Sequence, residues 1–161
     1  MDSLIYPKAR ILNKLLSEQG LKLAVAESCT GGWLSKAITD VSGSSASFYG
    51  GLVTYDNKAK INLLNVNPNT IDKHGAVSEQ TAAEMVQGLL KQCGVDIGLS
   101  ITGVAGPASG SDKKPVGTVW FGLIKKDSPV ECRKMFFPPG RSHVRGQSVV
   151  FALDWLIDSL K

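Results

Sequence analysis

Apolar residues recur at helical spacing in three long segments of the chain, at 8–19, 79–93 and 141–160. A period near 3.6 predicts amphipathic helices that each bury one face. Gly20 is placed to end the first helix, and Ser78 to cap the second. Their apolar positions are Ile11, Leu12, Leu15 and Leu16; then Ala82, Val86, Leu89 and Cys93; then Val149, Val150, Leu153, Leu156, Ile157 and Leu160. Shorter helices are predicted from the ESCTGG turn through about Asp40, and at 57–64 and 69–74.

Short apolar or alternating runs predict strands between these helices. They lie at 21–26, 50–55, 95–101, 117–125 and 130–137, and the last two suit an antiparallel pair. Helices that alternate with strands, joined by one late hairpin, predict an α/β fold with a mixed sheet. About 160 residues without a repeat or linker predict a single domain over 1–161.

Ligands of open α/β sheets gather in loops beyond the carboxyl ends of strands. Three stretches qualify, namely 27–32, 43–48 together with 55–60, and 102–117. The last is the most conspicuous, because structureless loops of more than about 12 residues inside a compact domain are usually functional.

Composition narrows the class of protein. Hydrophobic residues make up 43% of the chain and charged residues 20%, which argues against disorder. No apolar run reaches the roughly 18 residues that a membrane span needs, and the first residues lack a signal-peptide pattern. We therefore expect a cytoplasmic protein with no membrane partner. The net charge of +4 is spread along the chain, which argues against nucleic-acid binding.

Cysteine and histidine offer few chemical options. The three cysteines are widely separated and suit neither a disulfide framework nor a zinc site, so we expect no metal and no cofactor. His74 and His143 do not sit where a Ser-His-Asp triad would need them. Cys29 is either a thiolate activated at a helix start or a small buried residue, and the sequence leaves both open.

Two lysines stand out in GLVTYDNKAK, residues 51–60. If Asp56 or Asn57 caps the helix, Lys58 and Lys60 fall near its positive end, where cations are disfavoured by roughly 0.3–1 kcal/mol. A neutral lysine can accept a serine proton when burial or nearby positive charge lowers its pKa. The alternative is that both lysines simply point into water.

Anion binding has two candidate sources. CTGG at a strand-to-helix junction, 29–32, offers free N–H groups and hydroxyls that suit a phosphate or carboxylate. Arg141 and Arg145 open the last helix four residues apart and can project toward the same ligand.

Three long motifs resemble one known family. They are AESCTGGWLSKAITDVSGSSASFYGGLVTYDNKAK, HGAVSE and SITGVAGPASGSDKKPVGTVWFG. In this order they are similar to the C-terminal domain of the competence/damage-inducible protein CinA, a family that includes stand-alone nicotinamide mononucleotide amidohydrolases. The resemblance covers about 8–160. It implies a three-layer α/β/α sandwich with a mixed, mostly parallel sheet. It also implies hydrolysis of the carboxamide of nicotinamide mononucleotide to nicotinate mononucleotide and ammonia.

The resemblance also implies a set of site residues. Matching the family's motifs makes Ser45 the nucleophile, Lys60 its base and Tyr55 a helper, in a reaction through an acyl-enzyme, with Ser44 as an open alternative to Ser45. The substrate pocket would be lined by Ser28, Thr30, Gly31, Ser44, Thr102, Gly103 and Gly106, and Arg141 and Arg145 would clamp the phosphate.

The chain departs from the family's usual pattern at Lys58, Ser109 and Gly140, which leaves pocket shape and substrate preference open. A catalytically inactive relative that binds a nucleotide or a protein partner is the alternative reading. The expected partner is the small-molecule substrate, and the sequence leaves a homo-oligomer open.

Overall fold

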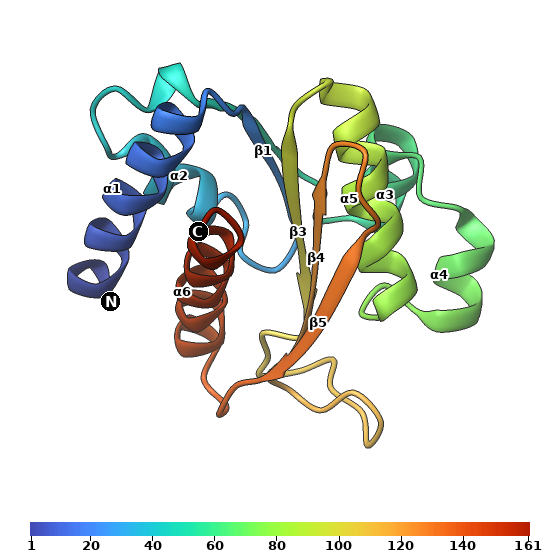
Figure 1. Cartoon of the computed structure of the whole chain (residues 1–161). Helices are drawn as coiled ribbons and strands as arrows, with labels where there is room; N and C mark the ends of the chain where they lie inside the picture. The colour runs from blue at the N-terminus through green and yellow to red at the C-terminus, as the bar shows by residue number, and fades with distance from the viewer.

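A five-stranded sheet forms the centre of the computed structural model, which describes residues 1–161 (Figure 1). Its strands lie in the order β2-β1-β3-β4-β5. Their bounds are β1 (Leu23–Glu27), β2 (Phe48–Val53), β3 (Ile97–Gly103), β4 (Thr118–Lys125) and β5 (Glu131–Phe136). The β2-β1 and β1-β3 pairs are parallel, whereas β3-β4 and β4-β5 are antiparallel. Only β4 therefore runs against the others, and the prediction of a mixed sheet with a late hairpin is confirmed.

Helices cover both faces of this sheet (Figure 1). One face carries α1 (Asp2–Gln19), α2 (Trp33–Thr39) and α6 (Arg141–Ser159), and the other carries α3 (Asn57–Leu64), α4 (Pro68–His74) and α5 (Glu79–Cys93). A core of 27 buried residues lies on the α1-α2-α6 side, and a smaller one of 7 lies under α3 and α5. The expected three-layer α/β/α sandwich is confirmed.

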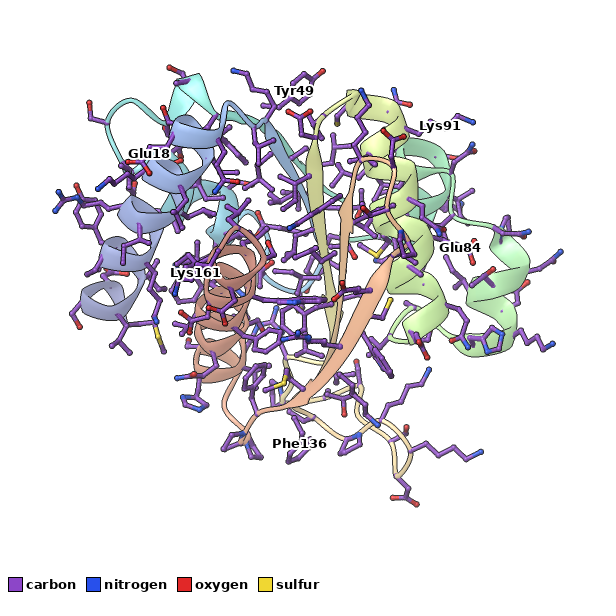
Figure 2. The ribbon with its side chains drawn as sticks, in the orientation of Figure 1. Glu18, Tyr49, Glu84, Lys91, Phe136 and Lys161 are labelled. Atoms are coloured by element: carbon purple, nitrogen blue, oxygen red, sulfur yellow. The ribbon has the colours of Figure 1, made fainter.

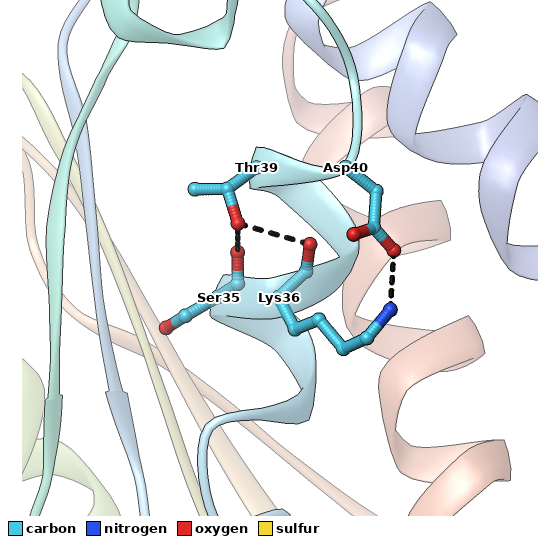
Figure 3. Close-up of polar contacts among 4 residues, drawn as sticks. All are labelled: Ser35, Lys36, Thr39 and Asp40. Carbon is cyan, nitrogen blue, oxygen red and sulfur yellow. Dashed lines mark hydrogen bonds and ion pairs between the residues drawn. The ribbon is translucent and has the colours of Figure 1, made fainter.

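Glycine shortens the second helix relative to the prediction. Gly31 and Gly32 adopt φ of +59° and +98°, so the ESCTGG stretch forms a turn and α2 begins only at Trp33. The other end of α2 is tied by side chains, as Figure 3 shows. There Lys36 Nζ donates to Asp40 at 2.6 Å, and the Thr39 hydroxyl bonds the carbonyls of Ser35 and Lys36.

Two exposed aromatic residues mark the ends of the sheet (Figure 2). Tyr49 lies where β2 begins, and Phe136 lies at the opposite end of the molecule, where β5 ends. Because β1, β2, β3 and β5 run in one direction, their carboxyl ends gather at the Phe136 end, beside the 104–117 loop. No helix is both long and apolar enough to cross a membrane.

Candidate active site

Lys60 is a buried lysine at the start of α3. Asp56 caps that helix by accepting from the Lys58 N–H at 2.8 Å, and Lys60 lies one turn further on with 1% of its surface exposed. Its Nζ lies 2.9 Å from the Thr54 carbonyl oxygen, 3.2 Å from the Tyr55 carbonyl oxygen and 3.1 Å from Ser28 Oγ. The amine therefore contacts three oxygens and no carboxylate.

Burial lowers the pKa of the Lys60 amine below its ordinary value. Cys29 and the Asp56 carboxylate act in the opposite direction and raise it. Lys58, the second lysine of the motif, is exposed, so it fits the solvated alternative. Removal of the amine from water is thus the main cause of the lowered pKa of Lys60.

Ser28 is fixed by the residues around it. It follows the last residue of β1, and its backbone N–H donates to the Ile101 carbonyl of β3 at 3.0 Å. The preceding Glu27 is fully buried, and its carboxylate accepts from the N–H groups of Leu34 and Ser35 at the start of α2. These bonds hold both ends of the Ser28–Gly32 turn.

A cavity of about 410 Å³ opens beside Ser28 and Lys60 at the carboxyl end of the sheet. It is lined by Ser28, Cys29, Tyr55, Asn57, Lys60, Ala76, Val77, Thr102, Gly103, Val104, Ala105, Gly106, Ala108, Ser109 and Arg141. Seven of the site residues that the family resemblance implies are thereby brought together: Ser28, Tyr55, Lys60, Thr102, Gly103, Gly106 and Arg141.

Arg141 provides the positive charge in the wall of this cavity. Its guanidinium donates to the Gly106 carbonyl at 2.8 Å and to the Tyr55 hydroxyl at 3.2 Å. The side chain is exposed, so it remains available to an anionic ligand. The Arg141 side chain thereby connects the start of α6 with the 104–117 loop and with the residues that precede α3.

Ser45 and Ser44, the expected nucleophile and its alternative, lie at the other end of the sheet. They form a short 3-10 helix, η1 (Ser44–Ala46), before β2, whereas Lys60 lies beyond its end. Lys22, just before β1, bonds the carbonyls of Ser45 and Ala46. Ser28 lies at the far end of β1, and a five-residue strand spans about 16 Å. The structure therefore does not bring Ser45 to Lys60, and the pairing must be revised.

Arg145, Thr30 and Gly31 lie behind the cavity. Arg145 Nε donates to the Cys29 carbonyl at 3.0 Å, and Nη2 donates to the Thr30 carbonyl at 3.2 Å. None of these three expected binding residues lines the cavity. Thr30 and Gly31 belong to the Ser28–Gly32 turn, and Arg145 binds that turn from the side away from Lys60. The expected pair of arginines is thus divided, with only Arg141 at the cavity.

Cys29 lines the cavity as a thiol and not as a thiolate. Burial raises its pKa to about 12, which leaves the nucleophilic form scarce at neutral pH. The structure thus favours the small-buried-residue alternative. Neither histidine lines the cavity, and no group of His, Cys, Asp or Glu side chains is placed to hold a metal ion.

Two lining residues, Ala76 and Val77, lie outside the three stretches that the sequence singled out. The Ala76 carbonyl accepts from the hydroxyl of Thr102, another lining residue, at 2.8 Å. The sequence pointed to these residues only through the motif HGAVSE at 74–79. Its glycine-containing turn lies before a capped helix, and such loops often contact ligands.

Comparison with known proteins shows which family this chain belongs to. The family model described as the CinA C-terminal domain matches residues 6–160. The nicotinamide-nucleotide amidohydrolase PncC of Enterobacter agglomerans is 51% identical over 138 residues, which cover 86% of this chain and 84% of that protein. A putative competence-damage inducible protein of Halothermothrix orenii is 49% identical over 93% of this chain, but this chain spans only 36% of its length.

Solved structures show the same fold. The crystal structure of the competence/damage inducible protein CihA from Agrobacterium tumefaciens superposes with a TM-score of 0.94. It is 39% identical, and the superposition covers 98% of this chain and 95% of that one.

Proposed function

Because the chain belongs to the CinA C-terminal domain family, we propose that it hydrolyses the carboxamide of nicotinamide mononucleotide. The products are nicotinate mononucleotide and ammonia. A relative that matches over most of both chains bears the name nicotinamide-nucleotide amidohydrolase, which supports this reaction. Some relatives are much longer than this chain, which spans only 36% of one of them. The proposed activity is therefore that of the cavity around Ser28 and Lys60, which lies within the matched region.

The contact between Lys60 and Ser28 is the observation that carries the mechanism. The carbonyls of Thr54 and Tyr55 can only accept hydrogen bonds, so they hold the two hydrogens of a neutral amine. The remaining lone pair then faces Ser28 Oγ at 3.1 Å. This arrangement is that of a general base beside its nucleophile.

The reaction proceeds in two halves. Lys60 takes the proton of Ser28, and Ser28 Oγ attacks the carboxamide carbon to give a tetrahedral intermediate. The carbon–nitrogen bond then breaks, and the leaving nitrogen departs as ammonia with the proton held by Lys60. In the second half Lys60 activates a water molecule, which cleaves the acyl-enzyme and releases the nicotinate carboxylate and free Ser28.

Other residues of the cavity bind and orient the substrate. The guanidinium of Arg141 suits the 5′-phosphate, for which its fork of N–H donors provides two hydrogen bonds. Tyr55 acts twice, since its carbonyl holds Lys60 and its hydroxyl accepts from Arg141. We therefore assign Tyr55 to positioning of Lys60 and Arg141 and not to proton relay.

Release of ammonia from nicotinamide mononucleotide by the purified chain tests the function, with nicotinate mononucleotide identified as the second product. Ser28→Ala and Lys60→Met are expected to lower kcat by about 10³-fold or more, because nucleophile and base act as a unit. Ser45→Ala is the matched control, since it removes the same hydroxyl at the other end of the sheet. It is expected to retain wild-type activity.

The outcomes separate the two assignments. A wild-type chain that binds nicotinate mononucleotide but releases no ammonia would favour the inactive binding protein. An active chain whose Ser28→Ala variant keeps its rate, while Ser45→Ala loses it, would retain the reaction but reject the Ser28–Lys60 dyad.

A further inference from the structure

Glu27 is a buried carboxylate that joins the two ends of the Ser28–Gly32 turn. None of its surface is exposed, and it does not line the cavity. Its Oε1 accepts from the Leu34 N–H at 2.8 Å, while Oε2 accepts from the Ser35 N–H at 3.0 Å and from the Ser35 hydroxyl at 2.7 Å. The carboxylate thereby ties the start of α2 back to the residue that precedes the proposed nucleophile.

These hydrogen bonds are the compensation that the buried carboxylate receives. No lysine or arginine forms an ion pair with it. A carboxylate removed from water is costly unless its oxygens accept hydrogen bonds, so the loss of any of its donors is opposed. Gly51 of β2 encloses the contact, because a Cβ at that position would lie 2.1 Å from Ser35 Oγ. Glu27 and Ser35 are therefore held in one arrangement.

The backbone of the same residue leads to Lys60. The Glu27 carbonyl accepts from the Thr54 N–H at 2.8 Å, and the Thr54 carbonyl in turn lies 2.9 Å from Lys60 Nζ. Ser28 follows Glu27 directly in the chain, and its Oγ lies 3.1 Å from the same Nζ. Glu27 is thus joined to the proposed nucleophile by a peptide bond and to the proposed base through two hydrogen bonds.

We propose that Glu27 is a positioning residue that fixes the distance between Ser28 and Lys60. This inference rests on the proposed amidohydrolase reaction. The Glu27 side chain holds the turn that carries Ser28, and its carbonyl holds the segment that binds Lys60. A nucleophile and its base must stay within hydrogen-bonding reach, and a misplacement of about 1 Å can cost 10²-fold in rate.

Glu27→Gln keeps the size of the side chain but not its pattern of acceptors. An amide has a single oxygen, so in either orientation its NH2 group faces the Leu34 N–H or the two donors of Ser35. The turn must then shift, and kcat for ammonia release from nicotinamide mononucleotide is expected to fall about 10- to 100-fold. KM should change less than threefold, because every residue that lines the cavity is retained.

Ser35→Ala is a milder variant of the same contact. It removes the hydroxyl that Glu27 accepts from and leaves the carboxylate with both N–H groups. Its kcat is expected to fall about 3- to 10-fold, between the wild type and Glu27→Gln, again with KM changed less than threefold.

Glu84→Gln is the matched control. The Glu84 carboxylate also holds a backbone N–H ahead of a helix, that of Asn67 before α4, at 2.9 Å, but Glu84 does not line the cavity. Its kcat and KM are expected to equal those of the wild type. Thermal unfolding of the three variants gives a temperature at which all are folded, and the rates are compared there. A loss of kcat in Glu84→Gln equal to that in Glu27→Gln would reject the proposal.

The pH profile separates positioning from an effect of charge. Burial lowers the pKa of Lys60, and Cys29 and Asp56 oppose it. Glu27→Gln should therefore lower the plateau of kcat/KM and leave the midpoint of its rise with pH unchanged. A midpoint that moves to lower pH, with the plateau retained, would reject positioning and show that the Glu27 charge acts on Lys60.

The remaining results distinguish this inference from the reaction on which it rests. A wild-type chain that releases no ammonia would reject the amidohydrolase function, and the inference with it. In an active chain, Glu27→Gln and Ser35→Ala with kcat within twofold of the wild type would reject the positioning role alone. A rise in KM with kcat retained would also reject it, and would show that the turn shapes the binding cavity. If Glu27→Gln does not fold, Ser35→Ala decides between these results.

Discussion

Burial of the Lys60 amine costs free energy, and no other residue of α3 buries a charged group in this way. A buried amine loses its hydration, and only three neutral oxygens compensate it, namely those of Ser28, Thr54 and Tyr55. The neutral form avoids most of this cost, which is why burial both destabilises the charged lysine and prepares a base. The destabilisation of charged Lys60 and its proposed role as a base thus both follow from burial of the amine.

The pH dependence of activity should report the Lys60 amine. Only the neutral amine accepts the Ser28 proton, so kcat/KM is expected to rise with pH and to level off above the Lys60 pKa. Burial places that midpoint below the ordinary lysine value of 10.5. Steady-state values of kcat/KM from pH 6 to about pH 11 measure this rise. A midpoint at or above 10.5 would contradict a buried, neutral base.

Stability should change with pH for the same reason. Because the folded pKa of Lys60 is lowered, the unfolded chain binds more protons between that pKa and 10.5. The free energy of unfolding of the wild type is therefore expected to rise with pH across this window, relative to that of Lys60→Met. Urea unfolding of both proteins at several pH values measures the difference. A difference independent of pH would show that the folded pKa of Lys60 is not lowered.

At the scale of elements, the first turn of helix α3 determines where Lys60 lies relative to Ser28. Asp56 fixes where α3 begins, and the start of the helix sets the height at which Lys60 meets Ser28. The neighbouring helix α4 begins in the same way, since the side chain of Asn67 accepts from the Asn69 N–H at 2.9 Å. The two caps are chemically alike, but only the first carries a residue that contacts Ser28.

Removing each cap should therefore separate stability from activity. Asp56→Ala and Asn67→Ala are each expected to lower the free energy of unfolding by about 1 kcal/mol. Only Asp56→Ala should also lower kcat. It should shift the pH–rate limb to lower pH, because the Asp56 carboxylate raises the Lys60 pKa. Denaturant unfolding and rate profiles of both variants provide the measurement. Equal rate losses in the two variants would show that α3 has no special part in placing the base.

At the scale of the whole molecule, the larger core supports the sheet from the side away from Lys60. Helices α1 and α6 pack on one another and on the sheet, and Leu12 of α1 is fully buried there. Ile11, its neighbour in sequence, is 49% exposed. The α3 side holds the smaller core, so overall stability depends mainly on the face that does not carry the base.

Cavity formation at Leu12 should test this division. Leu12→Ala is expected to cost about 2–5 kcal/mol of unfolding free energy. For a domain of this size that lowers Tm by roughly 5–15 °C. At a temperature where the variant is folded, KM should match that of the wild type. Ile11→Ala, the exposed control, should stay within about 0.5 kcal/mol. Thermal unfolding provides the measurement, and a similar loss in both variants would place Ile11 in a contact that buries it.

The sequence by itself determined the elements and much of the cavity. Periodicity predicts α3 and α5 with the bounds observed, and it predicts the late hairpin, because local hydrogen bonding and burial of one face set these features. Motif resemblance identifies Lys60 and the residues of β3 and the following loop that line the cavity, including Thr102 and Gly106.

Only the tertiary structure decided which serine meets the lysine. Ser28 and Ser45 both lie in Gly- and Ser-rich turns next to strands, so local pattern does not separate them. The parallel pairing of β1 with β2 places the residue after β1 beside the residues after β2, and places η1 at the opposite end. The placement of α6 likewise brings Arg145 to the back of the Ser28 turn and leaves Arg141 at the cavity. Strand direction, a long-range property, therefore determined the chemistry that local pattern left undecided.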